Sequence, residues 1–276
     1  MSTYAILHGR RVNVVSSNPT NPKEGEVWYN STLGQLKGYV MGTAAWSSGG
    51  TYPTNIYGAA GAGNTPAGLA FGGYNGSGGI TTTSEYDGST WTGGGALPVA
   101  KRYLTGFGTQ TAALGAKGRV PTGSPSEVNT SEEYDGSSWT SGGTASVAAS
   151  LLSGSGTQTS GLVFGGTDSS RTNSTEEYNG SSWTTGGNLG TAKANLSGSI
   201  GGTQTAALAF FGDDGSTPLP TNTEAYDGTS WSEQSNVPAG RFAGGGAGTQ
   251  TNAYGFGGYT SPGVPNQTTS TINYNG

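Results

Sequence analysis

The chain contains no cysteine and only one histidine among its 276 residues. Without cysteine, no disulfide can stabilise the fold and no thiol can act as a nucleophile or a metal ligand. A copper site of the kind found in oxidase propellers needs His and Cys ligands, which one histidine cannot provide. We therefore expect no enzyme activity and no cofactor.

Charge and long apolar runs are also scarce. Charged residues make up 10% of the chain, and the formal net charge is −5 at pH 7. No apolar run reaches the roughly 18 residues of a membrane-spanning helix, so we expect no membrane span. No basic stripe is visible, which argues against nucleic-acid binding. The N-terminus has a short apolar stretch before Arg10 and Arg11, the reverse of the order in a secretory signal.

Glycine and aromatic residues are abundant instead. The chain has 53 glycines and 12 prolines, a share close to that of low-complexity sequences. It also has six Trp, 14 Tyr and seven Phe residues, and these recur at regular spacing. A disordered chain would not carry aromatic residues in this way. The composition therefore indicates a folded repeat protein whose core consists of aromatic and small residues.

One motif, Tyr-Asp/Asn-Gly-Ser/Thr-Ser/Thr-Trp, occurs in full four times. A fifth copy is split, because its tyrosine lies at the C-terminal end and its tryptophan near the N-terminal end. The period is 44 to 48 residues, which is typical of propeller blades. The repeat tyrosines and tryptophans are Tyr86, Tyr134, Tyr178, Tyr226 and Tyr274, with Trp46, Trp91, Trp139, Trp183 and Trp231.

Each period predicts four short strands, here called a to d. A Gly-Thr-Gln-Thr marker follows strand a in four repeats, and residues 63–66 are a divergent fifth copy. Strand b ends in glycines, and strand c ends in the repeat tyrosine. The Asp-Gly or Asn-Gly pair predicts a two-residue type I′ turn into strand d, with φ positive at both positions. The fold class that follows is an all-β, five-bladed propeller of four-stranded antiparallel blades.

The split copy predicts how the ring closes. Residues 43–48, which contain Trp46, would form strand d of the last blade, so that both ends of the chain share one sheet. This arrangement removes the exposed edges of an open array. The predicted domains are an N-terminal arm and β-hairpin over residues 1–40 and a propeller over residues 41–276.

The propeller region resembles the kelch repeat. The resemblance rests on Gly-Gly closing strand b, then Tyr, then Trp, and on basic residues before strand a at Lys101, Arg102 and Arg241. It covers about residues 41–276 and implies a kelch-like propeller. The chain departs from the family in its five blades, where six or seven are usual, and in its richness in Gly, Ser and Thr.

Residues 21–39 resemble a segment of virion and tail structural proteins of tailed bacteriophages. In physical terms the segment predicts a hairpin, with strands at residues 26–30 and 35–40. The resemblance implies a virion location, extracellular after release, within an oligomeric assembly. Tyr4, Ile6, Arg10 and Arg11 are the candidate docking residues, and alternating apolar positions such as Val12 and Val14 could add a strand to the sheet of a partner. His8 is interpreted as solvated or partner-facing.

Acidic residues precede each repeat tyrosine on strand c. Their recurrence favours a structural or solvated role, and a ring of carboxylates that binds cations is the alternative; they are Glu85, Glu132, Glu133, Glu176, Glu177 and Glu224. Asp213 and Asp214 stand, in this alignment, where other repeats have Gly-Gly. Hard oxygen ligands there could hold Ca²⁺, although a plain loop explains them as well.

The loops between strands b and c differ in length and content and should emerge on one face of the disc. Loops on a rigid scaffold commonly carry recognition, and a tolerant surface is the alternative. The candidate binding residues are Tyr74, Arg119, Arg171, Asp213 and Tyr259. The leading hypothesis is a non-enzymatic virion structural protein that assembles with other virion proteins. The alternative is a module that binds a host-surface receptor or glycan; a propeller hydrolase is disfavoured because no convergent acid pair is evident.

Overall fold

A computed structural model describes residues 12–19, 26–38, 48–121, 126–261 and 266–276 of the chain. The chain divides into two compact units, Met1–Ser48 and Gly49–Gly276. The predicted docking residues Tyr4, Ile6, Arg10 and Arg11 lie outside the described residues, as do His8 and Trp46.

The N-terminal unit contains a three-stranded sheet in the order β1-β2-β3. Its strands are β1 (Asn13–Val15), β2 (Val27–Asn30) and β3 (Gln35–Gly38). β2 and β3 pair antiparallel from Asn30 and Gln35 outward, so the hairpin predicted from sequence is confirmed. β1 pairs with β2 in parallel, which was not predicted. On the face of this sheet that carries Trp28 and Asn30, Asn18 Oδ1 accepts hydrogen bonds from Trp28 Nε1 at 3.2 Å and Asn30 Nδ2 at 2.9 Å.

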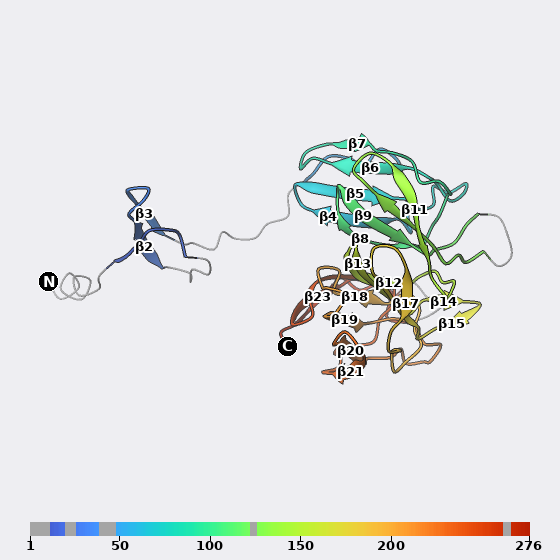
Figure 1. Ribbon diagram of the computed structural model, residues 1–276. Coiled ribbons are helices and arrows are strands. Elements are labelled where there is room, and N and C mark those ends of the chain that lie inside the picture. Colours follow the sequence, from blue (N-terminus) through green and yellow to red (C-terminus); the bar gives the residue numbers. More distant parts are fainter. Residues whose placement is uncertain (1–11, 20–25, 39–47, 122–125, 262–265) are drawn as a thin grey trace. The chain divides into compact units, whose positions relative to one another are not determined.

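The second unit is the five-bladed, all-β propeller predicted from sequence (Figure 1). Each of blades 1 to 4 is a four-stranded antiparallel sheet, and blade 5 has three strands in the described part of the chain. The predicted contribution of residues 43–48 to blade 5 falls almost wholly outside the described residues. Blades 1 and 2 contain β4 (Ala60–Asn64), β5 (Ala67–Phe71), β6 (Thr83–Tyr86), β7 (Trp91–Gly93), β8 (Thr105–Thr109), β9 (Ala112–Ala116), β10 (Thr130–Tyr134) and β11 (Trp139–Thr144). Blades 3 to 5 contain β12 (Ser153–Thr157), β13 (Ser160–Phe164), β16 (Thr175–Tyr178), β17 (Trp183–Thr185), β18 (Ser197–Gly198), β19 (Ala207–Phe210), β20 (Thr223–Tyr226), β21 (Trp231–Gln234), β22 (Gly245–Thr249), β23 (Asn252–Phe256) and β24 (Thr271–Tyr274).

The turn between strands c and d differs from the prediction. Tyr86 pairs directly with Trp91, so four residues separate the strands rather than two. Asp87 acts through its side chain, since its Oδ1 accepts the backbone N–H groups of Ser89 at 2.8 Å and Thr90 at 2.7 Å. This Asx turn explains the preference for Asp or Asn, and Gly88 supplies the positive φ of 95°. The type I′ assignment was therefore wrong.

The repeat tryptophans join neighbouring blades. In blade 2 the Trp139 ring lies 4.9 Å from Tyr134 of its own blade and 4.7 Å from Phe71 of blade 1, between ring centroids. Its Nε1 donates to Thr83 Oγ1 of blade 1 at 2.9 Å. The same donation runs from blade 3 to blade 2 and from blade 4 to blade 3, through Trp183 and Ser131 and through Trp231 and Thr175. Each indole thus gains a polar partner while its ring is packed.

The glutamine of each Gly-Thr-Gln-Thr marker is a second link between blades. Gln158 Nε2 of blade 3 donates to the backbone oxygens of Ala113 at 3.1 Å and Tyr134 at 2.7 Å, both in blade 2. Equivalent pairs of bonds are made by Gln110, Gln204 and Gln250. The in-phase recurrence of the marker is the sequence signal of this role, which was not predicted.

Between β14 (Thr167–Asp168) and β15 (Ser170–Arg171) the b–c loop of blade 3 forms a small hairpin of its own. The other described b–c loops carry isolated bridges rather than further paired strands. The loops therefore differ in structure as well as in length, while the blades that carry them repeat.

Candidate functional site

Four of the five candidate loop residues occupy the same structural position in their blades. Tyr74, Arg119, Asp213 and Tyr259 each form an antiparallel bridge with a residue that precedes strand a of the same blade. Arg171 comes from the b–c hairpin of blade 3 and reaches Asp213 in blade 4. The structure thus places all five on the face that carries the b–c loops, which we call the loop face.

A ring of left-handed residues surrounds the central channel on the loop face. We call it the channel rim; its members are Gly58, Tyr103, Leu151, Asn195 and Ala243, with φ between 52° and 64°. Each backbone N–H of the last four donates to the carbonyl oxygen of the member before it, at 2.7 to 3.0 Å. Such φ values cost a residue with a side chain free energy, and the hydrogen bonds offset that cost. A cavity of about 380 Å³ opens inside the rim.

An aromatic cluster with one guanidinium lies at the rim beside blades 1 and 2. The Tyr57 ring is 5.1 Å from Tyr74 and 6.3 Å from Tyr103, between centroids. The Arg102 guanidinium lies 4.7 Å over the Tyr74 ring and 5.6 Å over the Tyr103 ring. Tyr57 is 54% exposed, and Arg102 Nε is buried with no hydrogen-bond partner in the described part of the chain. The cluster offers flat apolar faces beside a cation, an arrangement suited to ligands with both apolar and polar surfaces.

Two ion pairs lie elsewhere on the loop face. Arg119 Nε donates to Glu127 Oε1 at 2.8 Å, and Arg119 with Ser126 lowers the pKa of that carboxyl against the opposing effect of burial. Arg171 donates to Asp213 Oδ2 at 2.7 Å and to the Asp213 carbonyl at 2.8 Å. The first pair lies within the b–c loop of blade 2, and the second joins the loops of blades 3 and 4.

The alignment of Asp213 and Asp214 with the glycine pair was wrong by two residues. Phe211 and Gly212, with φ of 59° and 108°, hold the positions that Gly72 and Gly73 hold in blade 1. Asp213 instead pairs with Arg171, and Asp214 Oδ1 accepts hydrogen bonds from Ser216. No group of three or more His, Cys, Asp or Glu side chains that could hold a metal ion occurs among the described residues.

The acids of strand c have two structural roles. Those directly before the tyrosine accept a hydrogen bond from the tyrosine hydroxyl of the next blade: Glu85 from Tyr134, Glu133 from Tyr178 and Glu177 from Tyr226. Burial, followed by this carboxylate, raises the pKa of Tyr134 to about 12. The pKa of Tyr178 is raised to about 12 for the same reasons.

The acids one position earlier form buried ion pairs with lysine. Lys101 Nζ lies 2.7 Å from Glu132, and Lys193 Nζ lies 3.7 Å from Glu224. Glu176 in blade 3 pairs with Lys117 of blade 2, which occupies a left-handed position held by glycine in blades 1 and 3. Burial lowers the pKa of each lysine, and the partner carboxylate opposes that shift. The cations that these carboxylates bind are lysine side chains, and the structural interpretation holds for them.

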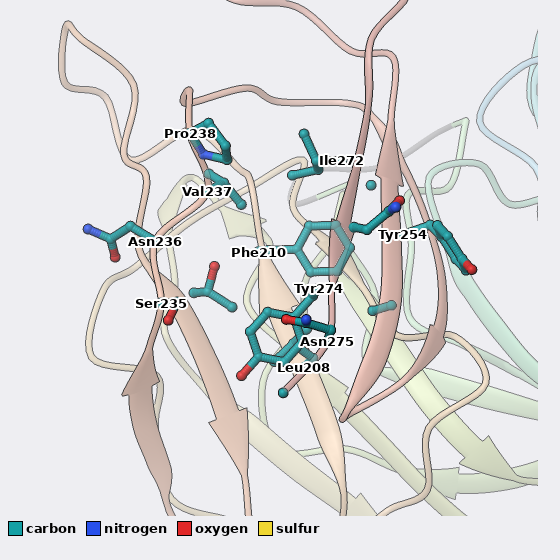
Figure 2. Close-up of a pocket in the computed structure, with 15 residues that line it drawn as sticks. Leu208, Phe210, Ser235, Asn236, Val237, Pro238, Tyr254, Ile272, Tyr274 and Asn275 are labelled. Carbon is teal, nitrogen blue, oxygen red and sulfur yellow. The ribbon is translucent and has the colours of Figure 1, made fainter.

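A pocket of about 190 Å³ lies between blade 4 and β24, the edge strand of blade 5. Figure 2 shows Phe210 and Val237 of blade 4 facing Ile272 and Tyr274 of blade 5 across it. Thr223 also lines the pocket. It is 2% exposed, and its Oγ1 has no hydrogen-bond partner among the described residues. This site was not predicted from the sequence, because its residues come from five separate segments.

The N-terminal unit exposes one apolar face of its sheet. Val27 and Tyr29 point away from the face that buries Trp28, and Val14 is the direct neighbour of Tyr29. Val14 is 67% exposed. Val14 belongs to β1, which already pairs with β2 in its own unit, whereas Val12 lies just before the strand. The other edge of β1 has no strand partner among the described residues.

Two further observations bear on identity. No helix that is long and apolar enough to cross a membrane occurs in the described part of the chain. Comparison with known proteins found no protein-family model and no curated protein that matches this sequence.

Proposed function

We propose that the chain is a non-enzymatic structural protein of a bacteriophage particle, associated with its tail or capsid. In this proposal the N-terminal unit attaches the protein to other virion proteins, and the propeller is displayed at the surface. The observation that carries the proposal is the exposed apolar face around Val14, Val27 and Tyr29, beside an edge strand that has no second strand partner among the described residues. Exposed apolar patches and unpaired strand edges are features that proteins commonly use to bind partners.

The non-enzymatic part of the proposal is supported by the use of the acids. The carboxylates of strand c are engaged by tyrosine or lysine side chains of the scaffold. Acid–base catalysis needs a titratable group that faces a substrate pocket. Because these acids are bound by side chains of the scaffold, we assign them a structural role.

The attachment proposal is tested by Val14→Asp in the full-length protein, with Val99→Asp on the propeller as a matched control. Both valines are exposed, at 67% and 48%. We expect Val14→Asp to lose incorporation into particles, measured by mass spectrometry of purified virions, while Val99→Asp is incorporated normally. Equal incorporation of the two variants, at unchanged thermal stability, would contradict attachment through this face.

A second candidate function is recognition of a host-surface glycan at the loop face. The cluster of Tyr57, Tyr74, Tyr103 and Arg102 favours it, because aromatic faces stack on sugar rings and a guanidinium donates to their oxygens. On a glycan array, Tyr57→Ala should lose binding that the wild-type protein shows, whereas Tyr254→Ala on another part of the propeller should keep it. Retention of every signal by Tyr57→Ala, or an array without signals, would reject this candidate.

A further inference from the structure

Most positive side chains of the propeller are neutralised within the fold. In the described part of this unit, ion pairs with acids engage Lys101, Lys117, Arg119, Arg171 and Lys193. Arg241 donates to the Ser270 carbonyl at 3.0 Å and to the Ser270 hydroxyl at 2.6 Å. Arg102 is the exception, because its guanidinium makes no hydrogen bond or ion pair with another described residue.

Arg102 presents this unpaired cation at the loop face. Its side chain is half-buried, and of its guanidinium nitrogens only Nε is buried without a partner, so the two terminal nitrogens remain open to solvent. The Tyr74 ring at 4.7 Å and the Tyr103 ring at 5.6 Å hold the cation in place without supplying an acid. The terminal nitrogens of an arginine offer parallel N–H donors that match the two oxygens of a carboxylate.

Backbone contacts fix the groups around this cation before any ligand binds. Arg102 exchanges two hydrogen bonds with Arg119, at 2.9 and 2.8 Å, and the Tyr103 N–H donates to the Gly58 carbonyl at 2.7 Å. A Cβ on Gly58 would lie 2.7 Å from Tyr103 Cδ1, so the Tyr103 ring lies against the channel rim only because residue 58 is glycine. A site that is formed in advance loses little conformational entropy when it binds.

The charge and the rings together indicate the class of ligand. The protein has a formal net charge of −5, so its overall field repels anions, and an anion must be held by a local contact. Beside Arg102, the Tyr57 ring is 54% exposed and offers an apolar face. One unpaired cation next to an exposed ring suits a ligand with one negative group and one apolar face. A sugar that carries a carboxylate has both.

We propose that this cluster binds the carboxylate of an acidic sugar, either a uronic acid or a sialic acid. The terminal nitrogens of Arg102 donate to the two carboxylate oxygens, and the exposed face of Tyr57 packs against the sugar ring. The inference rests on the second candidate function, glycan recognition at the loop face, and adds the charge that the glycan must carry.

The first test compares ligands that differ in the carboxylate. Oligomers of galacturonic acid are compared with their methyl esters, and sialyllactose with lactose, by titration calorimetry on the wild-type protein. We expect one acidic ligand to bind, which identifies the source of the carboxylate, and its neutral counterpart to bind at least about tenfold more weakly. Equal or tighter binding of the neutral members would overturn the carboxylate assignment but leave glycan recognition standing. No binding of any of the four ligands would overturn both.

The second test changes the cation. Arg102→Gln removes the charge, Arg102→Lys keeps the charge without the parallel donors, and Arg171→Gln removes a paired cation from the same face as the matched control. We expect the dissociation constant of the acidic ligand to rise roughly 10- to 100-fold in Arg102→Gln, to rise less in Arg102→Lys, and to stay unchanged in Arg171→Gln.

Melting temperatures establish that each variant is folded. Wild-type affinity in folded Arg102→Gln would overturn the role of Arg102, and an equal loss in Arg171→Gln would reject it in favour of the general charge of the face. If Arg102→Gln does not fold, Arg102→Lys takes its place, and unchanged affinity in that variant would overturn recognition by the parallel donors.

Discussion

The first three strands of blades 3 and 5 pair in the same order, but their side chains differ in burial. In blade 3, Leu162 and Phe164 of β13 are almost fully buried. Tyr254 and Phe256 hold the same positions in β23 of blade 5, and each is 46% exposed. The repeat pattern therefore sets which way a side chain points, and the neighbouring blade decides whether the side chain is covered.

The junction between blades 5 and 1 differs from the others in its sequence as well. Thr65 stands in blade 1 where the later blades have the linking glutamine. The Trp91 ring packs edge-on against Tyr52 at 4.9 Å. Blade 1 is thus built with fewer of the side chains that join the other blades, and the comparison between interior and terminal blades can be tested by substitution.

The largest effect is expected for Trp139→Ala, at the junction of blades 1 and 2. The substitution removes the ring packed on Phe71 and the donor to Thr83, so the free energy of unfolding should fall by about 5 kcal/mol. Trp91→Ala in blade 1 should cost clearly less, because Trp91 is only half-buried. Urea unfolding measures both values; equal losses would remove the distinction between the two junctions.

The next largest effect on stability is expected for Lys117→Met, because the substitution leaves Glu176 buried without its cation. We expect a loss of about 3 kcal/mol in the free energy of unfolding. The double variant Lys117→Met/Glu176→Met should recover much of that loss, whereas Lys37→Met in the N-terminal unit should leave propeller unfolding unchanged. A loss that persists in the double variant would assign the effect to packing rather than to charge.

Gln158→Ala tests the glutamine link and should cost about 1–3 kcal/mol, because two backbone oxygens of blade 2 lose their donor. Thr65→Ala, at the corresponding place in blade 1, should have little effect. Thermal unfolding of the two variants compares the junctions directly. Similar losses would mean that the glutamine adds nothing beyond the turn that it occupies.

A smaller effect is expected from tyrosine ionisation at high pH. The pKa of Tyr134 is raised from 10.0 to about 12, so above pH 10 the unfolded chain ionises before the folded one. Stability is therefore present below pH 10 and should be lost as the pH rises toward 12. Tyr134→Phe should make urea unfolding less dependent on pH over this window. An unchanged dependence would place the alkaline loss elsewhere.

The smallest effect is expected for Asp135→Asn, because blade 3 already has Asn179 in the same turn. Backbone N–H groups of Ser138 and Ser137 hold the pKa of Asp135 well below its usual value. Its contribution is therefore present above about pH 4 and lost as the pH falls. The variant should match the wild type at pH 7 and differ only in acid, in melting temperatures recorded from pH 7 to pH 2.

The sequence predicted what repeats along the chain. The spacing of the Tyr and Trp residues was enough to identify five blades, and two short strand segments on either side of a turn identified the hairpin of β2 and β3. The sequence could not predict the ion pair of Lys117 with Glu176 or the hydrogen bond from Trp28 to Asn18, because those contacts join residues of different segments. The misalignment of Asp213 arose because Phe211 occupies a position that glycine holds in blades 1, 3 and 5, and only its φ angle identifies the place.

In the candidate site, too, the repeated features were predictable from the sequence and the contacts between separate segments were not. The loop residues were placed on one face because the b–c loops recur in order. The grouping of Tyr74 with Tyr57, Arg102 and Tyr103 depends on the residues that precede strand a, which vary from blade to blade. The pocket of Figure 2 could be found only in three dimensions, since its residues do not form a sequence motif.

The glutamine, tryptophan and channel-rim donors all point from one blade to the blade before it. In a row of such blades, the donors of the first blade and the acceptors of the last blade have no partner within the row. Every junction within the row has the same kinds of donors and acceptors. Contacts made only between neighbouring blades do not depend on the number of blades in the propeller. Duplication of one repeat within the gene would therefore create a new junction like the others, and blade number can change in evolution without new contacts being invented.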